Sequence, residues 1–162
     1  MTQASALVNR LQKLENRIMQ VLLKDPEFRS AIHEEHHFHT TTFNHSINVA
    51  RLAVRIACKF KIKVNFSDLI MGALLHDYFH HNGHKLPRFE WIHAVQGAKN
   101  ARKRFHINDR VYHIIATHMF PMNISKWPKT KEAWLVNFSD KVCAVKEFFN
   151  ILRPFKSKRM CL

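Results

Sequence analysis

The chain has 162 residues and a mass of 19.2 kDa, which is the size of one domain that can bury its own core. Its net charge is +14 at pH 7. Hydrophobic residues make up 46% and charged residues 23%, a composition that excludes a disordered chain. Only three glycines and five prolines are present, too few for the closely spaced turns of a β-sandwich or β-barrel.

Four helices are expected in the first half of the chain. Over residues 4–23, apolar side chains recur in steps of three and four, and Asp25-Pro26 ends this helix. A short helix is expected at 27–32, a histidine-rich loop at 33–42 and a long helix at 43–60. Ser67 is predicted to be the N-cap of the fourth helix, with Asp68 in its first turn, and this helix runs to His76-Asp77.

Three further helices are expected in the second half, at 90–105, 109–119 and 130–152, after a loop over 78–88. The large aromatic side chains in these helices are expected to pack in the core: Trp91, Trp134, Phe148 and Phe149. The sequence therefore predicts an all-α fold, a single-domain bundle of six or seven helices over 1–162. Its core is expected at about 43–149, with an N-terminal helical extension over 1–42 and a basic tail over 153–162.

No targeting or disulfide signal is found. No apolar run approaches the ~20 residues that span a bilayer, and the first residues lack the apolar centre of a signal peptide. The three cysteines are scattered: Cys58, Cys143 and Cys161. This pattern favours a reducing, cytoplasmic location with no membrane partner, and it argues against a thiolate zinc cluster.

Potential metal ligands occur on five of the expected helices, each beside apolar residues. The dyad His76-Asp77 ends the apolar run GALLHD, and the other helices carry His45, His93, His118 and Asp140. A buried imidazole or carboxylate without a partner is costly, and a shared metal site satisfies several of these groups at once. The sequence therefore predicts that these six side chains converge on divalent metal.

The types of donor atom restrict which metal ions are expected and indicate what reaction they could support. Imidazole and carboxylate ligands without cysteine favour Fe or Mn, and leave Zn, Ni, Co and Mg open. Asp77 could bridge two ions, with His45, His76 and Asp140 around the first and His93 and His118 around the second. Two cations ~3.5–4 Å apart polarise a phosphoryl oxygen and lower the pKa of a shared water towards ~7, which supplies a metal-activated hydroxide.

The ordered set His45 … His76-Asp77 … His93 … His118 … Asp140 resembles the H…HD…H…H…D signature of the HD-domain metal-dependent phosphohydrolases in their two-metal form. The stretches FNHSINVARLA, GALLHDYFHH and LVNFSDKVCA agree, and the resemblance covers about 43–149. It is closest to small stand-alone bacterial members. It implies an all-α fold, one or two divalent ions, and hydrolysis of phosphate esters or anhydrides, often in nucleotides. A one-metal site would need only His45, His76, Asp77 and Asp140.

Further roles follow for residues near the dyad. Besides Asp77, the catalytic candidates are His80 and His81, one of which could protonate the leaving group. The candidates for binding substrate phosphate are His84, Lys85, Arg88 and Lys141. The loop after the dyad, with His80, His81 and His84, departs from the family, because many members have a glycine and a charged residue soon after the dyad. Arg51 could also bind phosphate, or pair with an acidic residue of a neighbouring helix.

The +14 charge leaves more than one partner open. It could steer an anionic, phosphate-bearing small molecule such as a nucleotide into the site, or it could bind nucleic acid. The first hypothesis is a phosphohydrolase. The alternatives are a nucleotide- or nucleic-acid-binding sensor without turnover, and a di-iron oxygenase, because a few HD proteins use this ligand order for oxygen chemistry. The oligomeric state is not predicted.

Overall fold

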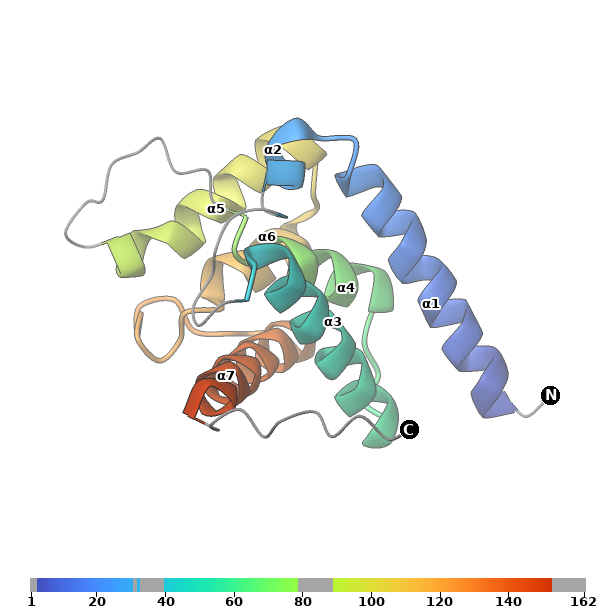
Figure 1. The fold of residues 1–162 in the computed structure, drawn as a ribbon. Coiled ribbons are helices and arrows are strands. Elements are labelled where there is room, and N and C mark those ends of the chain that lie inside the picture. Colours follow the sequence, from blue (N-terminus) through green and yellow to red (C-terminus); the bar gives the residue numbers. More distant parts are fainter. Residues whose placement is uncertain (1–2, 31, 33–39, 79–88, 153–162) are drawn as a thin grey trace, which may run out of the picture.

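The computed structural model describes residues 3–30, 32, 40–78 and 89–152, and within these residues the chain forms seven α-helices (Figure 1). They are α1 (Gln3–Leu22), α2 (Pro26–Ser30), α3 (Thr42–Lys59), α4 (Phe66–Leu75), α5 (Phe89–Phe105), α6 (Asp109–Thr117) and α7 (Lys131–Leu152). The predicted all-α fold is confirmed. Among the described residues, no helix combines the length and hydrophobicity that crossing a membrane requires.

The start of α4 differs from the prediction. Asn65, not Ser67, is the N-cap: its backbone is extended, and its side-chain oxygen accepts hydrogen bonds from the backbone N–H groups of Ser67 (3.0 Å) and Asp68 (3.1 Å). Both Asn and Ser are good N-caps, so their side chains alone do not fix the boundary. The backbone N–H of Asn65 also donates to Glu132 of α7 at 2.8 Å, which holds the cap in this register.

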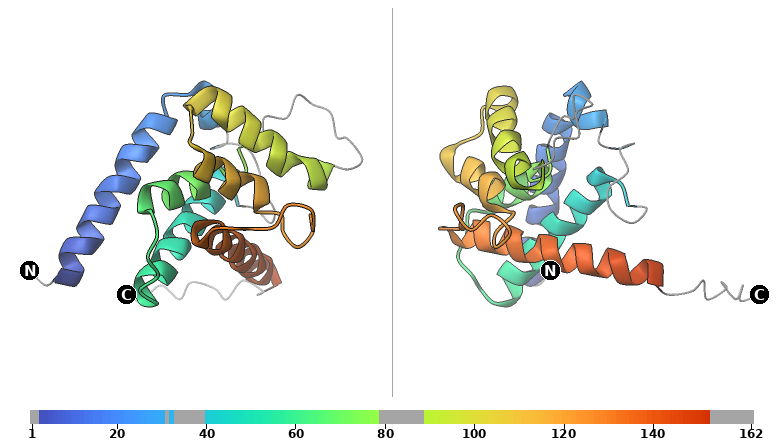
Figure 2. Two further views of the ribbon diagram at one scale, coloured as in Figure 1. Left: turned by 180° about the vertical axis from the view of Figure 1, so that it is seen from behind. Right: turned by 90° about the vertical axis from the view of Figure 1, so that its left-hand side faces the viewer.

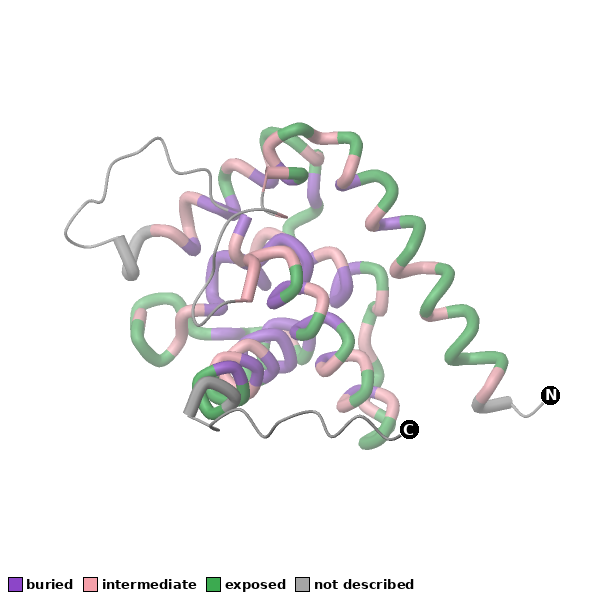
Figure 3. The backbone as a smooth tube through the Cα atoms, viewed as in Figure 1, coloured by how far each residue is buried: buried purple, intermediate pink, exposed green. Residues whose placement is uncertain are grey.

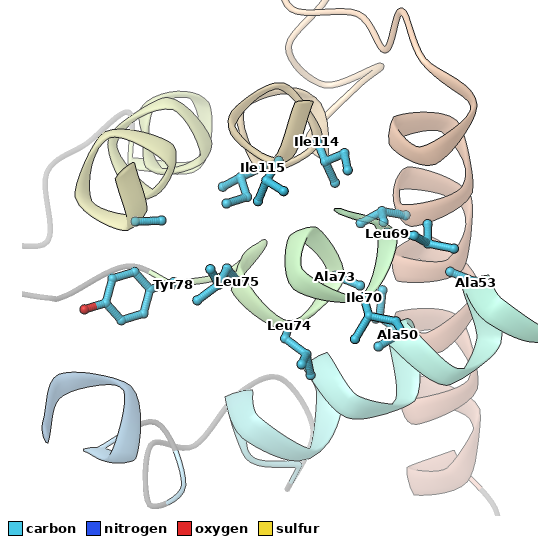
Figure 4. Packing of buried hydrophobic residues seen from close by; sticks show 14 of the residues in the cluster. Ala50, Ala53, Leu69, Ile70, Ala73, Leu74, Leu75, Tyr78, Ile114 and Ile115 are labelled. Carbon is cyan, nitrogen blue, oxygen red and sulfur yellow. The ribbon is translucent and has the colours of Figure 1, made fainter. Parts of the chain in front are cut away.

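The core is built around α4, which is almost entirely buried and lies in the middle of the bundle (Figures 1 and 3). Figure 4 shows the side chains of this helix between those of α3 and α6, with α7 alongside. Fully buried aliphatic residues from α4 and α6 fill this space: Leu69, Ile70, Leu74, Leu75, Ile114 and Ile115. Burial of each such side chain stabilises the fold by roughly 1.5–3 kcal/mol.

A glycine allows α4 and α6 to approach closely. A Cβ atom on Gly72 would lie 2.6 Å from Cγ2 of Ile114 and 2.9 Å from its Cβ. The two helices therefore meet almost backbone to side chain at this crossing. As a result the C-terminal ends of α4 and α6, where His76 and His118 follow, are fixed relative to each other.

The remaining helices surround this centre. Figure 2 shows α1 along one side of the bundle and the C-terminal half of α7 reaching beyond the other helices. Arg51 of α3 pairs with Glu15 of α1 through an Nε–Oε1 distance of 3.0 Å. Of the two roles considered for Arg51, the structure therefore contains the ion pair with an acidic residue of a neighbouring helix.

Four large aromatic residues were expected in the core, and this expectation is wrong for the three that lie on α7. Trp134, Phe148 and Phe149 are 45%, 43% and 57% exposed, while the side chain of Trp91 lies outside the described residues. α7 carries large apolar residues around its whole circumference, and the face towards α3, α4 and α6 is the one that packs in the core. Trp134 instead contacts Phe120, with the ring centroids 5.5 Å apart. Cys143, on that inner face, is buried.

Candidate metal centre

Helix ends deliver most of the candidate ligands to the middle of the bundle. His45 lies in the first turn of α3, His76 and Asp77 directly follow α4, and His118 directly follows α6. His93 and Asp140 lie within α5 and α7. The buried crossings of α4 with its neighbours therefore bring five separate segments of the chain to one place.

The first group of ligands comprises His45, His76 and Asp140. Nε2 of His45 is 3.1 Å from Oδ1 of Asp140, and Nε2 of His76 is 3.7 Å from the same oxygen. One ligand atom from each residue lies within 4.8 Å of the others, the spacing that a single ion could span. Both imidazoles are buried, with 0% and 1% of their surfaces exposed.

The second group comprises Asp77, His93 and His118, and it meets the same spacing criterion. Oδ1 of Asp77 lies 3.2 Å from Nε2 of His118 and 3.8 Å from Nε2 of His93. The two imidazole nitrogens are 3.1 Å from each other. The three ligand atoms therefore all lie within 3.8 Å of one another.

Asp77 stands between the two groups. While its Oδ1 faces His118 and His93, its Oδ2 lies 3.2 Å from Nε2 of His76 in the first group. The two groups are also in contact through their imidazole rings, because the ring centroids of His76 and His118 are 5.1 Å apart. The carboxylate therefore has one oxygen towards each group, the arrangement expected of a bridging ligand.

The hydrogen bonds of the imidazoles show that a cation fits. Nδ1 of His76 and Nδ1 of His118 each lie 2.8 Å from the carbonyl oxygen three residues earlier, of Ala73 and Ile115 respectively. A carbonyl only accepts, so each Nδ1 carries the proton and a neutral ring turns the lone pair of Nε2 towards carboxylate oxygen. Buried Nε2 of His76 has no hydrogen-bond partner among the described residues. Two facing lone pairs repel, and a cation between them removes the conflict.

The charges of the first group also favour a bound cation. Burial lowers the pKa of His76, but the carboxylates of Asp77 and Asp140 outweigh burial and raise that pKa well above its ordinary value. Burial raises the pKa of Asp140, yet His45 and His76 hold it below the ordinary range for a carboxyl group. At neutral pH the carboxylate is ionised, and the group demands positive charge, either from protons or from a metal ion. Nitrogen and oxygen donors of this kind suit Fe, Mn, Zn and related divalent ions.

Two residues of α7 hold the segment that follows α6. The amide of Asn137 donates to the backbone oxygens of His118 and Phe120, each at 2.6 Å. Nζ of Lys141 donates to the same His118 oxygen at 2.7 Å and lies 3.4 Å from Oδ2 of Asp140. The carbonyl groups at the end of a helix lack partners within the helix, and α7 supplies them here.

The structure brings together all six predicted ligands, and Lys141 lies at the edge of the same cluster. Their roles as ligands, and the role of Lys141 as a phosphate contact, stay predictions. The other candidates lie outside the described residues: His80, His81, His84, Lys85 and Arg88.

Sequence reasoning missed two residues that support the cluster. Asn137 was not singled out, and neither was Glu147, whose carboxylate contacts Nδ1 of His45 at 3.0 and 3.1 Å. The signal was their spacing. Asn137 precedes Asp140 by three residues and Glu147 follows it by seven, so both share its side of α7.

Comparison with known proteins agrees with this geometry. The family model described as HD domain matches residues 42–145, more than half of the chain and a range that includes all six candidate ligands. No curated protein and no solved structure matches. HD domains bind divalent metals and are generally phosphohydrolases. The chain therefore belongs to the HD-domain family.

Proposed function

We propose that this protein is a divalent-metal-dependent phosphohydrolase that cleaves a phosphate ester or anhydride, with a nucleotide as the expected substrate class. The observation that supports it best is the position of Asp77, which turns one oxygen to each of two groups of nitrogen and oxygen donors. In this proposal His45, His76 and Asp140 hold one ion, and His93 and His118 hold the second. Fe or Mn is the favoured metal.

The bound ions would supply Lewis-acid polarisation of a phosphoryl oxygen and would acidify a nearby water. The protein contributes a largely buried set of polar side chains, and electrostatic interactions are strong in such surroundings. Its two ligand carboxylates, Asp77 and Asp140, are 15% exposed, and the histidine ligands are uncharged when they bind metal. Two carboxylates neutralise only half of the charge of two divalent ions, so the loaded site attracts a phosphate group.

Residues of the chain itself orient the reactants. Asp77 lies where it can position the attacking water between the two groups. His80 or His81 is the proposed donor of a proton to the leaving oxygen. The remaining cationic candidates, His84, Lys85, Arg88 and Lys141, would bind the non-reacting phosphate oxygens. Phosphoryl transfer depends mainly on such positioning and charge stabilisation.

The overall charge supports an anionic substrate. With a net charge of +14, the protein raises the local concentration of a polyanion such as a nucleotide. The same charge would favour binding of nucleic acid. A cytoplasmic location belongs to this proposal, because Cys58 and Cys143 are free thiols and nucleotides are abundant there.

Replacement of Asp77 tests the proposal. Protein purified without added metal should contain about two divalent ions per chain by elemental analysis, and Asp77→Ala should lose both metal and turnover of a nucleotide panel and bis-p-nitrophenyl phosphate. Asp109→Asn is the matched control, because Asp109 is 99% exposed and pairs with Arg102 away from the site. Full activity of metal-free Asp77→Ala would contradict the proposal.

The same assays separate the alternatives. Anaerobic hydrolysis of the phosphodiester supports a hydrolase and argues against an oxygenase. Tight, salt-dependent binding of RNA or DNA without any turnover would instead support a sensor. Oxygen consumption with an organic substrate, in the absence of phosphate release, would support the oxygenase.

A further inference from the structure

Glu147 is a buried carboxylate whose side chain is directed at one of the candidate ligands. It is 8% exposed, and its two oxygens lie 3.0 and 3.1 Å from Nδ1 of His45, which is itself fully buried. The other nitrogen of the ring, Nε2, faces Asp140 at 3.1 Å. Glu147 and Asp140 are seven residues, or about two turns, apart on α7, so one helix holds the imidazole at both ends.

The need for Glu147 follows from the place of His45 in its helix. His76 and His118 follow the ends of α4 and α6, and each satisfies Nδ1 with a carbonyl three residues earlier. Carbonyl groups without helical partners occur at C-terminal ends, whereas His45 lies in the first turn of α3. Its Nδ1 therefore takes its acceptor from another helix, and that acceptor carries a full negative charge.

We propose that Glu147 is a positioning residue for the metal centre: it fixes the Nδ1–H tautomer of His45 and turns Nε2 to the first ion. This inference rests on the proposed function, since it assumes that His45 binds metal. A carboxylate can only accept, so the proton stays on Nδ1 and the lone pair on Nε2. The negative charge also makes Nε2 a stronger donor than a carbonyl would. Glu147 lies beyond residue 145, where the match to the family model ends.

A hollow that Glu147 lines makes the proposal testable by chemical rescue. The hollow has a volume of about 220 Å³, and Glu147 lines it together with Arg51, Arg55 and Lys146. Removal of the carboxylate by Glu147→Ala would open this space towards Nδ1 of His45. Formate is small enough to enter, and the surrounding cations would attract it to the position of the missing carboxylate.

Mn²⁺ titrations, followed by the EPR signal of the free ion, test the inference without any activity assay. Wild-type protein, Glu147→Ala and Glu147→Gln are compared, with Glu132→Gln as the control. Glu132 is also on α7 and 7% exposed, but it binds the backbone N–H of Asn65 outside the site. Loss of such a partner typically weakens metal binding 10–100-fold. We expect a loss of about this size for one ion in Glu147→Ala, a smaller loss in Glu147→Gln, and partial recovery of Glu147→Ala in formate but not in chloride.

Melting of the metal-free variants shows whether each one folds. If Glu147→Ala does not fold, the nearly isosteric Glu147→Gln decides alone, because it keeps a weaker, uncharged acceptor. Unchanged Mn²⁺ affinity in the folded variants would overturn the role of Glu147, and so would an equal loss in Glu132→Gln. Absence of Mn²⁺ binding by the wild-type protein would instead overturn the proposed metal centre itself.

Discussion

Gly97 controls the distance between α5 and the segment that carries the dyad. It lies one turn after His93 on α5, and a Cβ atom there would lie 2.9 Å from the backbone oxygen of Tyr78, the residue after Asp77. Ordinary contacts begin at 3.4 Å, so Gly97→Ala must move α5 or the Asp77–Tyr78 backbone by roughly half an ångström. A backbone oxygen cannot rotate away as a side chain can.

The expected energy is the difference between two effects. Overpacking lowers the free energy of unfolding by about 1–3 kcal/mol, while the higher helix propensity of alanine over glycine raises it by about 1 kcal/mol. The net destabilisation is therefore about 0–2 kcal/mol, which lowers the melting temperature by up to roughly 8 °C for a chain of this size.

The effect on metal binding should be selective. α5 supplies His93 to the second group, and none of the first group comes from α5. Gly97→Ala should thus weaken binding of the second ion by more than tenfold, since displacements of less than an ångström matter at such sites, and should leave the first ion nearly unchanged.

Thermal melting of the metal-free protein and Mn²⁺ titration measure the two effects. Lys99→Ala, at an exposed position on the same helix, controls for general changes in α5. If Gly97→Ala binds both ions as the wild-type protein does and melts no lower, the close approach of α5 to Tyr78 does not limit the site.

Three further predictions concern stability. Asn65→Ala should cost about 0.5–2 kcal/mol in urea unfolding, and Ser67→Ala less than about 0.5 kcal/mol; the reverse order would restore Ser67 as the N-cap. Burial raises the pKa of Asp25, but its hydrogen bond and ion pair with Arg104 outweigh burial and lower that pKa below the ordinary 3.8. Asp25 therefore stabilises the fold above pH 3.8, and this contribution disappears as the pH falls through the lower folded-state value, so the stability gap between wild type and Asp25→Asn should shrink in acid. A gap independent of pH would contradict this. Finally, metal at 100 times its dissociation constant should stabilise the fold by about 2.7 kcal/mol, so a chelator should lower the melting temperature by roughly 5–11 °C. An unchanged melting curve would argue against metal in the core.

Local patterns predicted the helices well and their packing less well. The apolar stripes of α1 and α3 placed both helices within one residue of their observed ends, because periodicity and flanking residues are local signals. The start of α4 needed a contact from Glu132, more than sixty residues away. The exposure of Trp134 and Phe149 depends on which helices pack against α7, and a helix that is apolar all round does not reveal this.

The candidate site was predictable where residue type and order carry the chemistry. His45, His76, Asp77, His93, His118 and Asp140 stand out because buried imidazoles and carboxylates need partners. For Glu147 the only sequence signal is its spacing of seven residues from Asp140, which is weak on its own. It lies beside Lys146, near the end of a long helix, and resembles an ordinary surface carboxylate until α3 and α7 are placed together.

Anomalous diffraction from crystals soaked in Mn²⁺ shows whether two ions bind at these six residues, because it locates the ions without assuming any reaction. We expect one peak among His45, His76 and Asp140 and another among His93, His118 and Asp77, with the Asp77 carboxylate between them. Crystals of folded protein with no peak at either group would contradict a metal centre formed by these residues.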